Sequence, residues 1–553
     1  MAEQPHFPTG KPVDFVIVGS GAAGGVLAKE LSTNGFDVVV LEQGPYRKSP
    51  DFHHDEYSMI FENELIGGIG KHPQTFRPNN NEKAEINYAP PPAIYAHTVG
   101  GSSVHFSGNY WRMRPIDFNE HSRLGPISGT GFADWPITYE ELEPYYTKVE
   151  WEIGVSGAPG PFDPPRSKPY PVPPMPLKSS GVLFEKGARK LGLHPQPAPV
   201  AILSEPYNGR AACIHCGFCI LFGCEVGAKS SSLVSMIPVA EATGRCEIRP
   251  ESTVYRLETD KTGRVSEVLY WDKDGNEQGQ RAKAVILAAN GAETPRLLFL
   301  SESVRHPDGL ANDSGLVGKY LMWNMHSEVH AWFEEPLNEY KSIQCTRIVH
   351  DYYDNDESRG YYGGGGIDAR PLLDSMPIFF SLSGMPPDAP SWGSEYKRLL
   401  GEYFTRNMAV LCSNTSLALE SNNITLDPEV KDHWGRPALR TTYTDHPDDI
   451  AMSQFLQERS VEIMETAGAK KVWTLPVAPQ TFGAHLLGTC RMGDDPETSV
   501  VDRYHRSHEV KNLFICDGSS FVTSGRGQPS MTIQSLAFRA ADHITGFARR
   551  GEI

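Results

Sequence analysis

The strongest limits on the fold of this chain come from the segment Val13 to Gly44, VDFVIVGSGAAGGVLAKELSTNGFDVVVLEQG. It opens with a short β-branched apolar run, passes through a glycine-rich turn, continues with helical spacing and ends in a second apolar run. This order predicts a strand, a turn, a helix and a second strand. We therefore expect an α/β fold in which this end of the chain begins a parallel sheet.

The glycine-rich turn GSGAAG has the spacing of a phosphate-binding turn. Gly19 allows the tight turn, Gly21 allows close approach of a pyrophosphate, and Gly24 allows tight packing of helix on strand. The helix N-terminus adds amide donors and the positive end of a dipole. Glu42 ends the second strand, where its carboxylate can accept both ribose hydroxyls. The predicted dinucleotide site comprises Gly19, Gly21, Ala22, Ala23, Gly24 and Glu42, and its place near the N-terminus favours FAD over NAD.

The rest of the chain alternates between two sequence patterns, one typical of α/β structure and one rich in predicted strands. A strand, glycine turn and helix recur at 282–301 and after 477, whereas 329–476 is rich in aromatic and alternating stretches. The proline-dense stretch 157–176 predicts an extended connection. We expect a discontinuous nucleotide-binding domain with a second domain inserted in it. The predicted bounds are 10–118, 213–330 and 477–550 for the nucleotide-binding domain, which the resemblance described below implies to be FAD-binding, and 119–212 and 331–476 for the second, substrate domain and its connections.

Charge and hydropathy exclude several partners. The 553 residues carry a net charge of −17, which argues against binding to nucleic acid or an anionic membrane. No run approaches the roughly 20 apolar residues of a spanning helix. The first residues, MAEQPHFPTGKPVDFVIVG, lack a basic region followed by an apolar one, so we expect no export signal and a cytoplasmic location.

Four of the nine cysteines lie close together in CIHCGFCILFGC, with two, two and four residues between them. Such a tight run is typical of iron–sulfur ligation, whereas structural zinc prefers two separated pairs. A redox pair would not account for four thiols, and Gly217 excludes attachment of c-type haem. A disulfide knot is disfavoured because the other cysteines are scattered, and inert thiols stay an alternative. The candidate metal ligands are Cys213, Cys216, Cys219 and Cys224.

Six further segments, in the order given, complete a family pattern. They are VGGSSVHFSGNYWRMRPIDF (99–118), DWPITYEELEPYY (134–146), NGAETPRLL (290–298), GLVGKYLMWN (315–324), AHLLGTCRMG (484–493) and ICDGSSFVTSGRGQPSMTIQSLAFRAAD (515–542). Together they resemble the glucose–methanol–choline (GMC) family of FAD alcohol oxidoreductases over nearly the whole chain. The resemblance implies a Rossmann-like FAD-binding domain, like that of p-hydroxybenzoate hydroxylase, with an antiparallel-sheet substrate domain above the flavin.

The resemblance also implies cofactor roles at matching positions. Val254 would contact adenine, with Ala289 near it. His105 stands where some relatives attach FAD covalently and others keep a packing or hydrogen-bonding histidine. The remaining implied contacts, along the flavin and at the pyrophosphate and ribityl chain, are Gly100, Gly101, Ser102, Asp517 and Gly518.

Alcohol oxidation needs a base for the hydroxyl proton, and histidine has an unperturbed pKa of about 6.5, near working pH. His485 matches the family's catalytic histidine. Relatives pair this histidine with an asparagine or a second histidine before a proline, and here that residue is Gln528. An amide cannot act as the base but can donate to the substrate oxygen, and the extra methylene of glutamine leaves this role open.

The cysteine segment, NGRAACIHCGFCILFGCEVGAKSSS, resembles that of the catalytic subunits of FAD-dependent glucose, fructose, sorbitol, gluconate and glucoside-3 dehydrogenases. The resemblance implies a 3Fe–4S or 4Fe–4S cluster that passes electrons to a cytochrome or quinone-linked partner. A small escort subunit would carry the chain to the periplasm in such systems. The cysteine spacing departs from that branch, and Glu225 stands where a proline often follows.

The leading prediction is therefore a dehydrogenase that oxidises a secondary or anomeric hydroxyl of a sugar or glycoside. The alternatives are a GMC dehydrogenase or oxidase for a non-sugar alcohol without a cluster, and a flavin-bearing scaffold that has lost catalysis. Aromatic residues of the inserted region either stack on sugar faces or are ordinary strand residues, which is the more common case. They are Tyr352, Tyr353, Tyr361, Tyr362 and Trp392.

Overall fold

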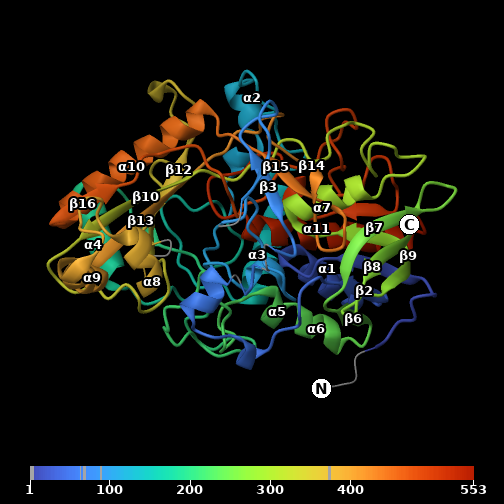
Figure 1. The fold of residues 1–553 in the computed structure, drawn as a ribbon, viewed down its shortest axis with the longest axis horizontal. Helices are drawn as coiled ribbons and strands as arrows, with labels where there is room; N and C mark the ends of the chain where they lie inside the picture. The colour runs from blue at the N-terminus through green and yellow to red at the C-terminus, as the bar shows by residue number, and fades with distance from the viewer. Residues whose placement is uncertain (1–4, 63, 67–69, 88–89, 372–374) are drawn as a thin grey trace.

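The computed structural model of this protein describes residues 5–62, 64–66, 70–87, 90–371 and 375–553. Within these ranges the strands form three sheets. Figure 1 shows the sheet that carries β1 and β9 at one end of the molecule and the sheet that carries β10 and β13 at the other.

The first sheet has a parallel half and an antiparallel half that share one long strand. The parallel strands are, in order, β6 (Cys246–Arg249), β2 (Val38–Leu41), β1 (Val13–Val18), β9 (Glu277–Leu287) and β17 (Leu513–Ile515). The first part of β9 pairs antiparallel with β8 (Val265–Trp271), which in turn pairs with β7 (Thr253–Thr259). The strand and turn predicted at the N-terminus therefore lie at the centre of a parallel sheet.

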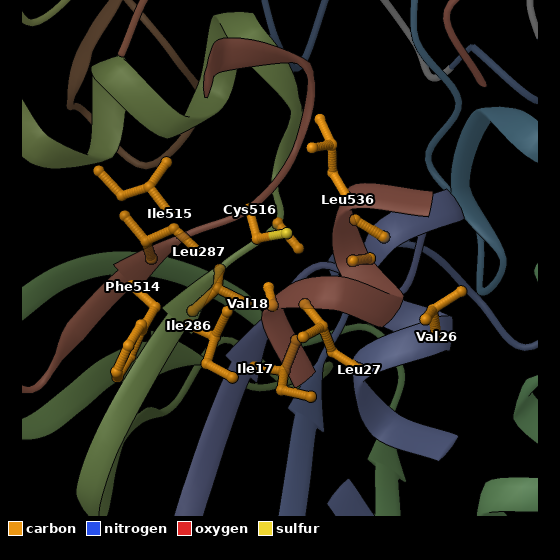
Figure 2. Packing of buried hydrophobic residues seen from close by; sticks show 14 of the residues in the cluster. Ile17, Val18, Val26, Leu27, Ile286, Leu287, Phe514, Ile515, Cys516 and Leu536 are labelled. Carbon is orange, nitrogen blue, oxygen red and sulfur yellow. The ribbon is translucent and has the colours of Figure 1, made fainter. Parts of the chain in front are cut away.

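Two long helices pack on the parallel half. These are α1 (Ala22–Thr33), which follows the glycine turn, and α11 (Ser530–Arg549). Figure 2 shows side chains of β1, β9 and β17 meeting those of both helices, and Ile17, Leu27 and Leu287 are fully buried there. Each such side chain stabilises the fold by about 1.5–3 kcal/mol. This core fixes the strand ends that carry the glycine turn.

The second sheet is antiparallel throughout. Its order is β16 (Lys471–Thr474), β10 (His326–Trp332), β13 (Asn407–Asn414), β12 (Gly365–Asp368), β11 (Arg347–Val349) and β5 (Gln196–Pro197). The helices α10 (Pro447–Ala467) and α4 (Ser179–Lys190) pack on one another and on this sheet. In Figure 1 they flank the sheet that carries β10, β12 and β13.

A third, small sheet contains β14 (Asn423–Lys431), β15 (Pro437–Thr442), β3 (Gln74–Arg77) and β4 (Glu85–Ile86). It contacts α7 (Asn290–Leu300) of the nucleotide-binding half through β14 and β15. The other α-helices of the described chain are α2 (Glu120–Leu124), α3 (Tyr139–Ile153), α5 (Ser232–Ser235), α6 (Ile237–Ala242), α8 (Pro377–Phe379) and α9 (Gly393–Arg406).

The predicted fold class is confirmed: a parallel sheet with a nucleotide-binding turn accompanies a separate antiparallel sheet. Among the helices in the described ranges, none has the length and apolar character that crossing a bilayer requires.

Candidate active site

One cavity of about 950 Å³ extends from the glycine turn to the histidine motif near the C-terminus. Its walls come from β1, β2 and the ends of the antiparallel sheet, segments that lie far apart in sequence. Gly24 and Gly100 lie behind the wall, while the other predicted cofactor and catalytic residues line it. Those lining residues are Gly19, Gly21, Ala22, Ala23, Glu42, Gly101, Ser102, His105, Val254, Ala289, His485, Asp517, Gly518 and Gln528.

The glycine turn has the geometry that a bound pyrophosphate needs. Gly19 has φ of +93°, and a Cβ on it would lie 2.5 Å from the carbonyl oxygen of Ala288. A Cβ on Gly24 would lie 2.0 Å from the carbonyl oxygen of Gly19. Gly21 is the N-cap of α1 and supplies no side-chain cap, so the first amide groups of the helix are open to a ligand. These residues fit the phosphate groups of a dinucleotide.

Glu42 lies directly after β2 and lines the cavity with its carboxylate held by hydrogen bonds. Its Oε2 accepts from the amide and hydroxyl of Ser20, at 3.0 and 2.7 Å, and Oε1 accepts from the amide of Gly44 at 3.0 Å. Burial raises the pKa of this carboxyl group, and the hydrogen bonds oppose that rise. The three bonds fix the carboxylate while leaving acceptor capacity for a hydroxyl group.

Asp517 is fixed in the same way on the other side of the cavity. Its Oδ2 accepts from the amide of Asn290 at 3.0 Å and the hydroxyl of Thr294 at 2.6 Å, and Oδ1 accepts from the amide of Ser519 at 2.8 Å. Asp517 thereby joins the start of α7 to the segment after β17. Both segments line the cavity, as the family resemblance implies for the residues that hold FAD.

One imidazole in the cavity wall, at the end where the family resemblance implies the flavin (called the flavin end below), has an unpaired nitrogen. His105 lies in the wall with Nε2 buried and without a hydrogen-bond partner. Burial, aided by the charge of Lys229, lowers the pKa of His105 to about 4, so the ring is neutral at pH 7. Most buried polar atoms have a hydrogen-bond partner, so an unpaired nitrogen in the cavity wall makes His105 a candidate contact for the cofactor.

His485 is held in one tautomer by a residue to which the sequence assigned no role. Its Nδ1 lies 3.1 Å from Oδ1 of Asn324. The amide nitrogen of Asn324 donates to the carbonyl oxygens of Asn414 and Gly525, at 3.2 and 3.1 Å, which fixes its oxygen toward the imidazole. His485 therefore donates through Nδ1–H, and its Nε2 carries the lone pair of a base. Gln528 lies beside the same ring, where it favours the protonated form of His485, and the Nε2 of Gln528 is buried without a partner.

Burial lowers the pKa of His485 to about 4, with the positive charge of Arg370 acting in the same direction. The unprotonated ring is the form that accepts a proton. We expect kcat/KM to be independent of this group near neutral pH and to fall only as the pH drops through about 4. A pH profile of kcat/KM for the free enzyme tests this. An acid limb at the unperturbed value, about 6.5, would contradict it.

The cysteine segment forms part of the wall of this cavity. Ile220 and Leu221, which lie between the last two cysteines, line it. The amide of Leu221 donates to the carbonyl oxygen of His105 at 2.7 Å. Lys229, a buried side chain, donates to the carbonyl oxygens of Phe106 and Cys219 at 3.0 and 2.5 Å. The thiol-bearing loop is thus tied to the segment that lines the flavin end.

All nine cysteines, which lie in the described ranges, are free thiols, so the disulfide interpretation is wrong for this structure. Zinc–sulfur bonds of 2.3 Å would hold four sulfurs within about 4 Å of one another. In the described part of the chain, the grouping compact enough for a single ion is His306, Asp313 and Glu509, outside the cavity lining. No three of the clustered cysteines bring their sulfur atoms within 4.8 Å of one another in the described ranges, which fits a single zinc ion poorly.

The five aromatic residues considered for sugar stacking are absent from the described cavity lining. Tyr353 and Tyr362 are buried and donate to the carboxylates of Asp117 and Glu120, at 2.6 and 2.7 Å. Trp392 is 83% exposed. Their structural interpretation is favoured over a sugar-binding one.

Two segments of the chain match sequence profiles of the same family. Residues 13–325 match the N-terminal part and residues 418–537 the C-terminal part of GMC oxidoreductases. The chain belongs to the GMC oxidoreductase family. The resemblance inferred from the sequence is confirmed, and FAD is the cofactor of this family that the cavity fits.

Relatives of this GMC oxidoreductase include named dehydrogenases. It is 35% identical to 2-methyl-1,2-propanediol dehydrogenase of Mycolicibacterium austroafricanum, over 96% of this chain and 95% of the relative. It is 31% identical to the fructose dehydrogenase large subunit of Gluconobacter japonicus, over 97% and 98%. It is 28% identical to the gluconate 2-dehydrogenase flavoprotein of Pantoea cypripedii, over 97% and 94%. The chain is thus an oxidoreductase of alcohol groups.

Solved structures support the fold. Formate oxidase of Aspergillus oryzae RIB40 superposes with a TM-score of 0.67 over 98% of this chain and all of that one, at 16% identity. At this identity the likeness establishes the fold and leaves the substrate open.

Proposed function

We propose that this protein is an FAD-dependent dehydrogenase that oxidises a secondary or anomeric hydroxyl of a sugar or glycoside and exports the electrons to a partner protein. The proposal rests on one observation: a candidate base and the cysteine segment line the same cavity. A neutral His485, held by Asn324, lies at its catalytic end, and the cysteine segment forms part of its wall. A base removes a proton, and a nearby redox centre removes electrons.

In this proposal, one set of residues binds the cofactor and another set moves the proton. The open amides of α1 would bind the pyrophosphate, Glu42 the adenosine ribose, and Asp517 the ribityl side. Bound FAD would supply the acceptor for the hydride that leaves the carbinol carbon. His485 takes the hydroxyl proton at Nε2, and the free Nε2–H₂ group of Gln528 donates to the substrate oxygen.

The four clustered thiols would hold an iron–sulfur cluster, which would supply one-electron transfer out of the site. Anaerobically purified protein is then expected to be brown and to contain about three or four iron atoms per chain. In Cys219→Ser, iron is lost and turnover with a one-electron acceptor such as cytochrome c fails, while flavin reduction by substrate persists. Iron analysis, EPR and stopped-flow absorbance measure these three properties.

The matched control is Cys246→Ala, which removes a buried thiol from β6 outside the cluster segment. It should keep its iron and its turnover with the acceptor. A yellow wild-type protein without iron would contradict the cluster and leave a simple flavin dehydrogenase.

A second candidate is a dehydrogenase for a small non-sugar diol. The 35% identity to 2-methyl-1,2-propanediol dehydrogenase favours it. Dye-linked turnover of the FAD-loaded protein on a panel of sugars, glycosides, diols and simple alcohols separates the two. We expect turnover with a polyhydroxylated substrate. Absence of turnover and of flavin reduction with every alcohol would contradict both and favour the non-catalytic scaffold.

The proposed partner is a cytochrome or quinone-linked acceptor, with a small escort subunit in addition. The name of one relative, a dehydrogenase large subunit, supports a multi-subunit assembly. Purification of the protein from its native cells, with its bound partners, tests this proposal. We also propose that the predicted domain bounds separate a cofactor-holding part from a substrate-holding part.

A further inference from the structure

A buried arginine from the antiparallel sheet lines the catalytic end of the cavity. Arg370 follows β12 by two residues and is only 3% exposed. Among the described residues that line the cavity, the other arginine is Arg296, which is paired with Glu293 and Asp432. Arg370 lines the same cavity as His485 and His326, whose ring centroids lie 5.3 Å apart, and its positive charge acts on both imidazoles.

Arg370 is held rigidly by residues of both halves of the molecule. Its Nη2 donates to Oδ2 of Asp368 at 3.0 Å, and Nη1 donates to the hydroxyl of Ser107 at 3.2 Å. When the side-chain amide of Asn109 is turned so that its oxygen faces the guanidinium, as its neighbours require, that oxygen accepts from Nη1 and Nε at 3.2 and 3.1 Å. Ser107 and Asn109 belong to the segment that lines the flavin end. These four contacts leave one of the five N–H donors of the guanidinium group for a ligand.

The charge of Arg370 is already balanced. Arg370 and Asp368 form an ion pair whose side chains are 3% and 1% exposed. A carboxylate ligand would leave a net negative charge in a buried site, which is costly. A hydroxyl or ring oxygen accepts the remaining N–H without adding charge. The site therefore suits a neutral oxygen.

We infer that Arg370 forms a second substrate subsite, which binds a neutral oxygen on the carbon next to the carbinol that is oxidised. The inference rests on the proposed function and narrows its substrate class to vicinal diols, including sugars. The reacting hydroxyl lies between His485 and Gln528, and its neighbouring oxygen accepts from Arg370. Simple alcohols and 2-hydroxy acids are then poor substrates.

Matched substrate pairs test the inference on the FAD-loaded protein. The pairs are 1,2-propanediol with 1-propanol and 2-propanol, 1,2-propanediol with lactate, and D-glucose with 2-deoxy-D-glucose. We expect kcat/KM of the wild type to favour the vicinal diol of any pair that turns over by at least about 10-fold, because a hydrogen bond to a charged donor is at stake. Equal values within the pairs, or a preference for lactate, would overturn the inference.

The variant Arg370→Lys keeps the positive charge, but its ammonium group cannot reproduce the planar arrangement of guanidinium N–H donors. Its KM for the diol is expected to rise about 10- to 100-fold with little change in kcat, while the simple alcohol is affected less than about 3-fold. Arg112→Lys is the matched control, since Arg112 is a buried arginine paired with Glu143 and Glu150 outside the cavity. It should keep the preference for the diol.

The remaining outcomes separate the inference from the proposed function. An equal loss on diol and simple alcohol in Arg370→Lys would assign Arg370 to support of the fold and overturn the subsite. Flavin content and melting temperature show whether Arg370→Lys folds. If it does not fold, the ratios of wild-type kcat/KM within the substrate pairs test the subsite on their own. Failure of the FAD-loaded wild type to oxidise any alcohol would overturn the proposed function itself.

Discussion

Flavin reduction by substrate is expected to slow by about 10²- to 10⁴-fold in His485→Ala, the range that a positioned general base contributes. The variant removes the only atom placed to take the hydroxyl proton in the proposed mechanism, Nε2 of His485. It leaves Asn324 and the glycine turn intact, so FAD should still bind. Stopped-flow absorbance at the flavin band measures the rate, and the bound flavin measured beforehand gives the concentration of competent sites.

The control is His194→Ala, at an exposed histidine that contacts Asp351. It should reduce its flavin at the wild-type rate. A His485→Ala protein that reduces its flavin at nearly the wild-type rate would refute the assignment of the base.

The second large effect is loss of the cofactor in Gly19→Ala. A left-handed φ costs an alanine about 1–2 kcal/mol, and here its Cβ would also overlap the carbonyl oxygen of Ala288. Relief of that overlap moves the turn that binds the pyrophosphate. We expect the purified variant to hold little or no FAD. The flavin-to-protein absorbance ratio and recovery of flavin on addition of FAD measure the effect.

Gly35→Ala separates strain from overlap. Gly35 has φ of +92°, almost that of Gly19, but a Cβ on it would meet nothing within 4 Å. This variant carries the same backbone cost and should keep its flavin. Equal flavin loss in both variants would show that general instability, and not the shape of the turn, removes the cofactor.

The nucleotide-binding turn and the strands beside it could be predicted because their determinants are local. The backbone angle of Gly19 and the strand β2, which ends just before Glu42, depend on residues within a few positions of each other. His485 could be singled out for another reason, the short family motif that contains it. The assignments of Glu42 and His485 to their roles stay predictions, and the structure adds that both residues line one cavity.

The support around the base could not be predicted in this way. Asn324 and His485 are 161 positions apart, and Arg370 and Ser107 are 263 apart. Asn324 ends the family segment GLVGKYLMWN (315–324), but the segment alone does not show that this residue contacts the histidine. Arg370 lies in the inserted region, where no motif marks it. The role of Lys229 was missed because the carbonyl oxygens that it binds come together only in the folded loop.

The family, the α/β class, the glycine-rich turn and the run of four cysteines can be recognised in the amino-acid sequence, because they depend on residue type and short-range spacing. Three features appear only in the folded chain: the cysteine segment forms part of the cavity wall, His485 is neutral and in one tautomer, and an ion-paired arginine lines the same cavity. Burial, charge and hydrogen-bond direction belong to the packed arrangement. They are set by side chains that meet only when distant segments of the chain are brought together.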